Sequence, residues 1–291
     1  MHARHFISRL AVFLFVIASL SGCGSKPVIG VLLPMSGDAG SYGESMKEAI
    51  DLALAEAEAD GSLPANLTVV WGDSATDPEK GREEIQRLAG QGADLIITGT
   101  TSGTARAFLQ ELEDSDVIAL SPSASAPSLT KDSKRFFRLF ASDELEGQRA
   151  GRFLFEDQNK TSVLIFSQDS EQARGIEPFF RQVYEGALGG TVVGRVLVGD
   201  ANWHEDCADL IAAHQPESVY IIAYANKTLE VLRHLRAKGY TGTICATSAF
   251  YSGEVLEQEP ELVDGVYFPQ PAFELQSDLE VSRIFVESFR A

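Results

Sequence analysis

Short runs of apolar residues recur along this chain, and each is followed by a segment whose apolar residues return with helical spacing. Val28 to Leu33 is the first such run, and residues 163–166 open a second series past the middle of the chain. Runs that are apolar at every position are typical of parallel strands, which helices bury on both faces. The alternation therefore predicts an α/β fold built from doubly wound parallel sheets.

The 291 residues are enough for two domains of ordinary size. Four strands alternating with helices form the first series, and the apolar, extended residues 136–141 leave it as a crossover. The second series repeats the pattern, and a second extended crossover begins near Val266. We therefore expect lobe 1 at residues 28–140, lobe 2 at 141–266 and a return to lobe 1 at 267–291.

Asp143 and Glu146 follow the first crossover and stand three residues apart. An acid at the first position with a Glu three residues later is the pattern of a capping box, which satisfies the free N–H groups of a helix start. Ala150, Phe153 and Leu154 then recur with helical spacing. We expect these two acids to open a helix whose inward side carries these three apolar residues.

Residues 1–22 have the organisation of a signal peptide. Arg4 and Arg9 precede an apolar stretch at residues 10–20, which is too short for a comfortable membrane span. The stretch ends in Leu-Ser-Gly-Cys, which resembles a bacterial lipobox with Cys23 as the lipidated residue. We expect a tether at residues 23–27 and a protein held on the periplasmic side of the cell envelope. A plain secretory signal with an incidental cysteine is the alternative.

The formal net charge of −18 argues against a nucleic-acid-binding face, and we interpret it as a source of solubility. Neither a phosphate-binding loop nor a dinucleotide-binding glycine pattern is present, so no cofactor is expected. No HExxH motif, GxSxG elbow or nucleophile–base pair stands out. The sequence therefore predicts neither a metal site nor an enzyme.

Cys207 falls on a predicted helix and Cys245 inside a predicted strand. An exported protein can pair its cysteines, but nothing in the spacing of these two favours a disulfide. We expect both to be buried, small apolar side chains.

Residues 95–127 contain two clusters of small hydroxyl side chains, and each cluster directly follows a predicted strand. Neighbouring parallel strands deliver their carboxyl ends to the same edge of a sheet, so the clusters should face each other across one crevice. Ser102 also begins a helix, where free N–H groups and the helix dipole favour an anion. We expect Ser102 and Ser125 to hold the anionic end of a ligand. The alternative is that Ser102 is a helix cap and residues 121–125 a turn.

The chain resembles the branched-chain amino-acid (Leu/Ile/Val) type of periplasmic substrate-binding protein from Val28 to its end. The segments that carry this resemblance are Met35-Ser36-Gly37 with Tyr42-Gly43, Asp73 with Asp77-Pro78, Gly99-Thr100-Thr101-Ser102, residues 121–127, Val219-Tyr220 with Tyr224, and Leu235 with Ala237-Lys238-Gly239. The resemblance implies a two-lobed receptor that closes around a small ligand and delivers it to an ABC permease.

The resemblance also implies which residues bind the ligand. In lobe 1 these are Tyr42, Thr101, Ser102, Ser123, Ala124 and Ser125, and in lobe 2 they are Tyr224 and Ser248. No cofactor and no metal are implied.

Two departures concern the ligand. Amino-acid receptors of this type carry an acid where Ser248 stands, and that acid pairs with the ammonium of the ligand. The expected loop at residues 169–175 also lacks the usual tyrosine. Because a buried ammonium without a partner is costly, the ligand is either a related carboxylate or amide, or an amino acid for which Asp169, Glu171 or Glu254 compensates.

Relatives of this type continue for several more elements, so we expect the C-terminus to be truncated. The second interpretation of the whole chain is an envelope sensor or scaffold lipoprotein that has the same fold and no transport role.

Overall fold

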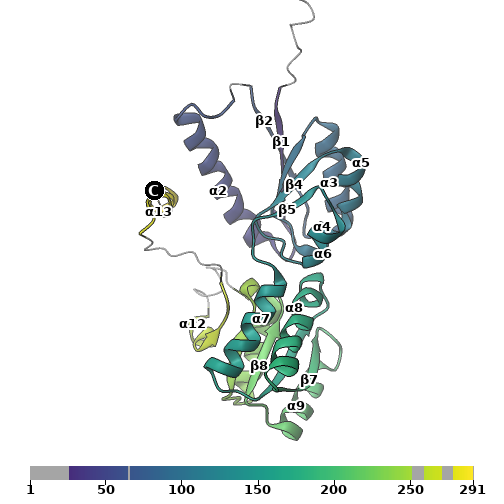
Figure 1. The fold of residues 1–291 in the computed structure, drawn as a ribbon, viewed down its shortest axis with the longest axis vertical. Coiled ribbons are helices and arrows are strands. Elements are labelled where there is room, and N and C mark those ends of the chain that lie inside the picture. The colour runs from purple at the N-terminus through teal and green to yellow at the C-terminus, as the bar shows by residue number, and fades with distance from the viewer. Residues whose placement is uncertain (1–25, 65, 251–258, 271–277, 291) are drawn as a thin grey trace, which may run out of the picture.

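The computed structural model describes residues 26–64, 66–250, 259–270 and 278–290, which form two α/β lobes placed end to end (Figure 1). Each lobe contains one five-stranded sheet, and every strand pair in both sheets is parallel. The predicted α/β fold with two doubly wound lobes is confirmed. The signal sequence, Cys23 and Glu254 lie outside the described residues.

The sheet of lobe 1 has the strand order β2-β1-β3-β4-β5. Its strands are β1 (Val28–Leu33), β2 (Thr68–Asp73), β3 (Leu95–Thr98), β4 (Ile118–Ser121) and β5 (Phe136–Arg138). Strand β5 is a difference from the sequence prediction, which expects only a crossover at residues 136–141. The extended backbone there pairs with β4, with Leu120 opposite Phe137, so the segment is an edge strand before it leaves the lobe.

Helices cover the two faces of this sheet unequally. The helices α3 (Pro78–Gly90), α4 (Ser102–Ala107) and α5 (Leu109–Ser115) lie on one face, and α2 (Gly40–Ala59) lies on the other (Figure 1). On the three-helix side, Leu32, Ile96 and Ala119 of the sheet share a core with Ile85, Leu88 and Phe108 of the helices. This core is the buried side that helical spacing predicted.

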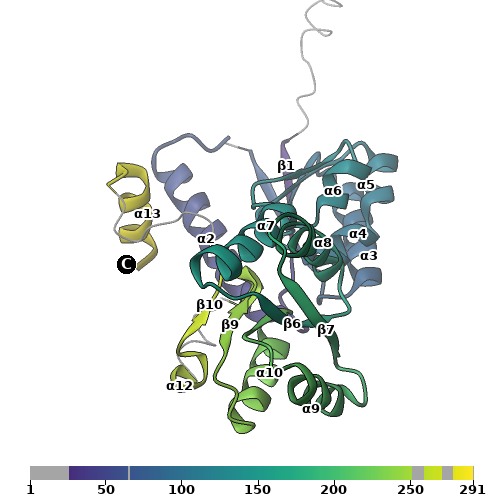
Figure 2. The same cartoon turned by 60° about the horizontal axis from the view of Figure 1, so that its bottom comes forward.

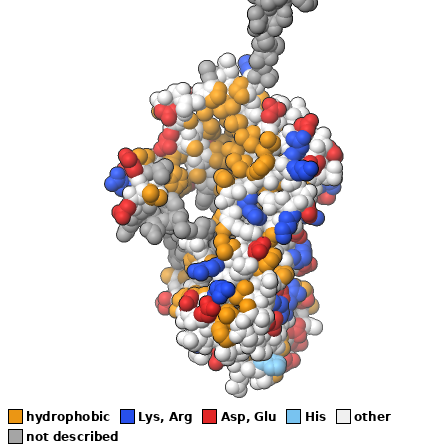
Figure 3. Space-filling view, in the orientation of Figure 1, with side chains coloured by type: hydrophobic (Ala, Val, Ile, Leu, Met, Phe, Trp, Pro, Cys, Tyr) orange, Lys and Arg blue, Asp and Glu red, His pale blue; other side chains and the backbone are white. Residues whose placement is uncertain are grey.

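The α2 side of lobe 1 leaves large apolar side chains in contact with solvent. Ile118 is 41% exposed, Phe137 50% and Leu139 72%. Figure 3 shows hydrophobic side chains gathered on this side of the upper lobe. The helix α13 (Glu280–Arg290) lies beside α2 (Figures 1 and 2).

The sheet of lobe 2 has the order β10-β9-β8-β6-β7. Its strands are β6 (Ser162–Gln168), β7 (Thr191–Val198), β8 (Ser218–Ile222), β9 (Thr243–Ala246) and β10 (Val266–Tyr267). Its helices are α7 (Asp143–Arg152) and α8 (Glu171–Arg181) on one face, and α9 (Trp203–His214) and α10 (Ala225–Ala237) on the other (Figure 2). The remaining short elements are α6 (Pro127–Asp132), α12 (Pro260–Val263), η3 (Ser248–Phe250) and the π-helical turns η1 (Phe153–Asp157) and η2 (Gln182–Ala187).

The two cysteines lie in different cores of lobe 2. Cys207 on α9 belongs to the core on the α9 and α10 side, whereas Cys245 on β9 faces α7 and α8. Both are buried and free, so the prediction of two unpaired, buried thiols is confirmed.

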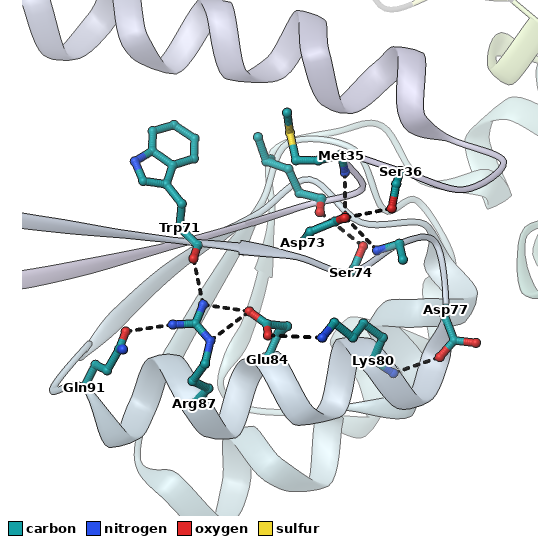
Figure 4. Close-up of polar contacts among 12 residues, drawn as sticks. Met35, Ser36, Trp71, Asp73, Ser74, Asp77, Lys80, Glu84, Arg87 and Gln91 are labelled. Carbon is teal, nitrogen blue, oxygen red and sulfur yellow. Dashed lines mark hydrogen bonds and ion pairs between the residues drawn. The ribbon is translucent and has the colours of Figure 1, made fainter.

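A hydrogen-bonded corner fixes the chain where it enters α2 (Figure 4). Asp73, the last residue of β2, accepts hydrogen bonds from the Met35 and Ala75 N–H groups at 2.9 and 2.8 Å and from the Ser36 hydroxyl at 2.7 Å. Nearby, Asp77 caps α3 by accepting from the Lys80 N–H at 2.8 Å. Asp73 thus holds the β1–α2 loop, and with it the start of the helix that carries Tyr42.

None of the helices in the described ranges is long and apolar enough to cross a membrane.

Candidate ligand-binding site between the lobes

The two hydroxyl-rich segments meet at the carboxyl edge of the lobe 1 sheet. Strands β3 and β4 are neighbours, with Ile97 opposite Leu120, so the segments that follow them emerge side by side. The Ser123 hydroxyl donates to the Thr100 carbonyl at 3.1 Å, and the Ser102 oxygen accepts from the Ser125 N–H at 3.2 Å. The prediction that the two clusters face each other is confirmed.

Ser102 is not the cap of its helix. Thr101 is the N-cap residue, and its side chain accepts from the Thr104 N–H. The Ser102 oxygen instead accepts from two amides across the crevice, those of Ser125 and Ala126, both at 3.2 Å. A hydroxyl has two acceptor positions and one hydrogen to donate. Since both acceptor positions are taken, Ser102 can offer only a donor to a ligand.

Ser123 has the opposite polarity. Its hydrogen goes to the Thr100 carbonyl, so its free lone pairs can only accept from a ligand. Two serines that look alike in the sequence therefore present different chemistry, one suited to a carboxylate oxygen and the other to an N–H group.

A cavity of about 250 Å³ lies beside these segments and is lined by both lobes. Of the predicted ligand-binding residues, the ones that line it are Tyr42, Thr101, Ser102, Ser123, Ser125, Tyr224 and Ser248. Ala124 is buried behind this lining, and its N–H donates to the Ser121 hydroxyl at 3.0 Å. Cavities for drug-sized ligands measure roughly 300–1,000 Å³, so this one suits a smaller molecule.

Two tyrosines close the cavity from opposite lobes. The Tyr42 hydroxyl of α2 donates to the Ala249 carbonyl of lobe 2 at 2.6 Å, and burial raises the pKa of Tyr42 to about 12. Tyr224 is the N-cap residue of α10, and burial followed by the charge of Asp143 raises its pKa. Both phenols are therefore neutral at physiological pH.

Two buried acids lie behind the cavity, where the sequence predicted neither of them. Asp143 and Glu146 of α7 are 0% and 7% exposed. They do not form a capping box, because Ser142 is the N-cap residue and its side chain accepts from the Glu144 N–H. Asp143 and Glu146 lie on the buried side of α7 together with Ala150.

Glu146 binds Ser248, the residue at the position where amino-acid receptors of this type carry an acid. One of its carboxylate oxygens accepts from the Ser248 N–H at 2.9 Å and the other from the Ser248 hydroxyl at 2.6 Å. Burial raises the pKa of Glu146, against the lowering effect of these two bonds. Lobe 2 therefore does place a carboxyl group beside Ser248. That group comes from Glu146 on helix α7 and not from the segment that follows β9.

Asp143 has no such partners. Among the described residues, no group makes a hydrogen bond of normal geometry to either of its carboxylate oxygens. Burial raises the pKa of Asp143 to about 8, and the nearby Ser125 hydroxyl opposes that rise. The side chain therefore keeps its proton at pH 7 in this structure.

A sequence profile of the family described as "Periplasmic binding protein" matches residues 27–291. The chain belongs to the periplasmic binding protein family. This is a family of solute-binding receptors and not of enzymes, and its members act on the periplasmic side of the cell envelope. The recognition made from sequence motifs is confirmed at the level of the family.

Individual relatives are similar at low identity. The Leu/Ile/Val-binding protein homolog 2 of Brucella abortus (strain 2308) is 22% identical over 261 residues, which cover 87% of this chain and 69% of that protein. The transporter substrate binding protein LivJ from Streptococcus pneumoniae, solved with isoleucine, has a TM-score of 0.82 at 22% identity, covering 91% of this chain and 77% of that one. A Rhodopseudomonas palustris solute binding protein solved with 4-hydroxybenzoate has a TM-score of 0.77 at 19% identity, covering 91% and 73%.

Of the acids proposed to compensate for Ser248, Asp169 and Glu171 flank the start of α8. Asp169 is exposed and paired with Arg174 at 2.5 Å, and Glu171 accepts from the Ser128 hydroxyl at 2.8 Å. Residues 171–175 are the first turn of α8 and not a loop, because Ser170 caps the helix, and Gln172 lines the cavity. Within the described ranges, no three His, Cys, Asp or Glu side chains are grouped to hold a metal ion.

A signal for the missed acids exists in the sequence. Asp143, Glu146 and Ala150 are spaced at i, i+3 and i+7, so both acids fall on the stripe that Ala150 and Leu154 mark as buried. Charged residues on a buried stripe are rare unless they are paired or functional.

Proposed function

We propose that this protein is a lipid-anchored receptor of an ABC importer that binds a small ligand bearing a carboxylate between its two lobes. The observation that carries the proposal is the Ser102 hydroxyl, which lines the cavity and has only its hydrogen left to give. A carboxylate oxygen is the ligand group that accepts such a bond most strongly.

The names of the similar proteins support a carboxylate ligand. One was solved with isoleucine and another with 4-hydroxybenzoate, and these two molecules share a carboxylate. They differ in the rest of the molecule, so the comparisons favour the common group and leave the ligand class to the chemistry of this cavity.

Binding would stabilise a closed arrangement of the lobes, with residues 28–140 and 141–266 as the moving bodies and residues 267–291 returning to the first. The contacts that cross between the lobes include Tyr42 to the Ala249 carbonyl and Ser128 to Glu171 at 2.8 Å. A ligand held by both walls adds contacts that exist only when the lobes are together, and this differential affinity drives closure.

Replacing Ser102 by alanine tests the carboxylate site. A hydrogen bond to a charged group contributes about 1.5–3 kcal/mol, so Ser102→Ala should weaken binding about 10- to 150-fold. Ser74→Ala is the matched control, because Ser74 is also a fully buried serine of lobe 1 but does not line the cavity. Calorimetric titration with leucine and 4-hydroxybenzoate measures both variants. Unchanged affinity of Ser102→Ala for whichever compound binds would contradict the proposal.

The lipid anchor and the permease are further parts of the proposal. We expect cleavage before Cys23 and acylation of its sulfur, which the intact mass of membrane-extracted protein would reveal. A soluble product that begins at another residue would rule the anchor out. The alternative of a sensor or scaffold without a small ligand predicts no thermal stabilisation by any member of a ligand library, whereas a receptor gains stability once the ligand exceeds its Kd.

A further inference from the structure

The first step concerns Gln172, a glutamine of lobe 2 that the proposed function does not use. It lies in the first turn of α8, where the Ser170 hydroxyl oxygen accepts from the Ala173 N–H at 3.1 Å and fixes the start of the helix. Gln172 belongs to the buried side of α8, and 5% of it is exposed. It also lines the cavity, so a capped turn of lobe 2 carries a buried polar side chain to the ligand-binding space.

The second step concerns the hydrogen bonds of the Gln172 amide. In the part of the chain that the structure describes, no group donates to this amide or accepts from it. The amide is not completely enclosed, as the unpartnered Tyr220 hydroxyl is, so its remaining accessible surface is turned to the cavity that Gln172 lines. A buried polar group without partners costs free energy, and a ligand that supplies the partners recovers that cost.

Gln172 differs in this respect from the other polar groups with which lobe 2 meets the cavity. The Ser248 hydroxyl already donates to Glu146 at 2.6 Å. The phenol of Tyr224 lies close enough to the Thr101 side chain for a hydrogen bond between them to lower its pKa, against the raising effect of burial. Gln172 is therefore the lobe 2 group whose hydrogen bonds are left for a ligand.

The third step concerns the charges near Gln172. Glu171 precedes it on α8, and its charge acts on Asp143, the buried acid of the neighbouring helix α7. The cation of this turn, Arg174, is exposed and already pairs with Asp169 at 2.5 Å. A second carboxylate on the ligand would therefore approach two acids and a cation that is already paired. A cationic group could bind the Gln172 oxygen, but it would leave both amide hydrogens unpaired.

A neutral group that donates and accepts satisfies both sides of the Gln172 amide. A primary carboxamide is such a group, because it is planar and can pair with the glutamine through two parallel N–H to O hydrogen bonds. The apolar part of the lining, which includes Pro34, Met46, Pro122 and Phe140, suits a short hydrocarbon chain between the two ends of the ligand.

We propose that Gln172 is a specificity-determining residue whose amide binds a carboxamide on the ligand, so that the receptor selects a small carboxylate with an amide end over one with a branched aliphatic end. This inference rests on the proposed carboxylate receptor and names the other end of its ligand. Ser102 of lobe 1 and Gln172 of lobe 2 then hold the two ends. Gln172 also lies in the segment that lacks the tyrosine usual in receptors of the Leu/Ile/Val type, and a different ligand end accounts for that departure.

The experiment is calorimetric titration of the full chain with two pairs of compounds of nearly equal shape. Asparagine and leucine differ in having an amide or an isopropyl end, and succinamate and 4-methylpentanoate form the same pair without the amino group. We expect the amide member of each pair that binds to do so about 5- to 150-fold more tightly, since the aliphatic member leaves the buried Gln172 amide unpaired.

Gln172→Met removes the amide and keeps a side chain of similar length. It should weaken binding of the amide compounds about 5- to 150-fold and leave the aliphatic compounds bound at least as tightly as before, so that the preference is lost or reversed. A loss of packing alone would weaken both members of a pair equally. Gln182→Met is the matched control, because Gln182 is an exposed glutamine at the other end of α8 and does not line the cavity.

Each outcome decides the inference. If the aliphatic member of a pair binds as tightly as the amide, or if only 4-hydroxybenzoate binds, the inference fails while the proposed carboxylate receptor stands. The inference also fails if folded Gln172→Met keeps the preference for the amide. If no compound binds to protein that melts cooperatively, the proposed function fails and the inference fails with it. If Gln172→Met does not fold, the preference of the unaltered protein within the two pairs decides alone.

Discussion

Two aspartates in this molecule have opposite surroundings. Asp73, at the end of β2, accepts three hydrogen bonds from the loop and hydroxyl groups around it (Figure 4). Burial raises its pKa, but the bonds from Ala75, Ser36 and Met35 together outweigh burial and lower the pKa of Asp73. Asp143 is buried more deeply and has no well-formed bond from the described residues, so its pKa rises to about 8.

The difference shows how the supply of hydrogen-bond donors decides what a carboxyl group does in the folded protein. Where the chain supplies donors, the ionised group holds a loop in one conformation and stabilises the fold. Where the chain supplies none, burial favours the neutral form and the group stays protonated. The following predictions test this contrast, from the largest expected effect to the smallest.

Asp143→Asn should remove a pH dependence of stability. The folded pKa of Asp143 is about 8 and its ordinary value is 3.8, so between these values the unfolded chain is ionised while the folded protein holds a proton. Stability must therefore fall as the pH rises through this window, by roughly 1.4 kcal/mol per pH unit. The variant lacks this slope and should gain roughly 3 kcal/mol over the unaltered protein between pH 5 and pH 7.

Urea denaturation at pH 5, 6 and 7, with Glu111→Gln as the control, measures this gain. Parallel stabilities of the variant and the unaltered protein at all three pH values would show that Asp143 is ionised in the folded state.

Asp73→Ala should act in the opposite direction, because it removes an acceptor from three donors. We expect a loss of about 2 kcal/mol at pH 7, the scale of a hydrogen bond to a charged group. The folded pKa of Asp73 is lowered, so its contribution is present above the unfolded value and is lost as the pH falls through the folded value. The loss should thus shrink in acid.

The exposed Asp132, which pairs with Arg106, provides the control for this variant. Asp132→Ala should cost at most about 1 kcal/mol, as exposed ion pairs do. An equal effect of the two substitutions would mean that the corner around Asp73 has no special stability.

Ser248→Glu sharpens the contrast by adding a charge where the chain already has one. From sequence, a glutamate here restores the missing acid and should raise affinity for a branched amino acid. The structure predicts the reverse, because Glu146 already binds Ser248 and a second carboxylate would meet it without a cation. Two carboxylates that share a site cannot both ionise easily, and we expect a loss of about 1–2 kcal/mol at neutral pH.

The exchange variant Ser248→Glu with Glu146→Ser separates the explanations. It moves the carboxyl group from α7 to the segment after β9, so it should recover most of the lost stability. Thermal melts of both variants at pH 5 and pH 8 provide the test. If Ser248→Glu alone is as stable as the unaltered protein at pH 8, the expected repulsion from Glu146 is contradicted.

Much of the fold followed from local pattern. The uniformly apolar strands required helices on both sides of each sheet, and helical spacing identified the faces that pack, such as Ile85 and Leu88 of α3. Parallel pairing then placed the ends of β3 and β4 at one edge, which is why Ser102 and Ser123 could be assigned to one crevice from the sequence. The edge strand β5 was missed, because three residues carry no period that separates a strand from an extended linker.

The chain by itself determined the two lobes, the edge where the cavity lies and the hydroxyl groups that line it, since each of these depends on short periods and on the geometry of parallel strands. Only the tertiary structure decided the polarity of Ser102 and Ser123 and the positions of Asp143 and Glu146. The direction of a hydroxyl and the partners of a carboxylate depend on groups distant in sequence, as Ser248 is from Glu146. The spacing of two acids along one helix is the same whether they cap that helix or lie buried between it and the other elements.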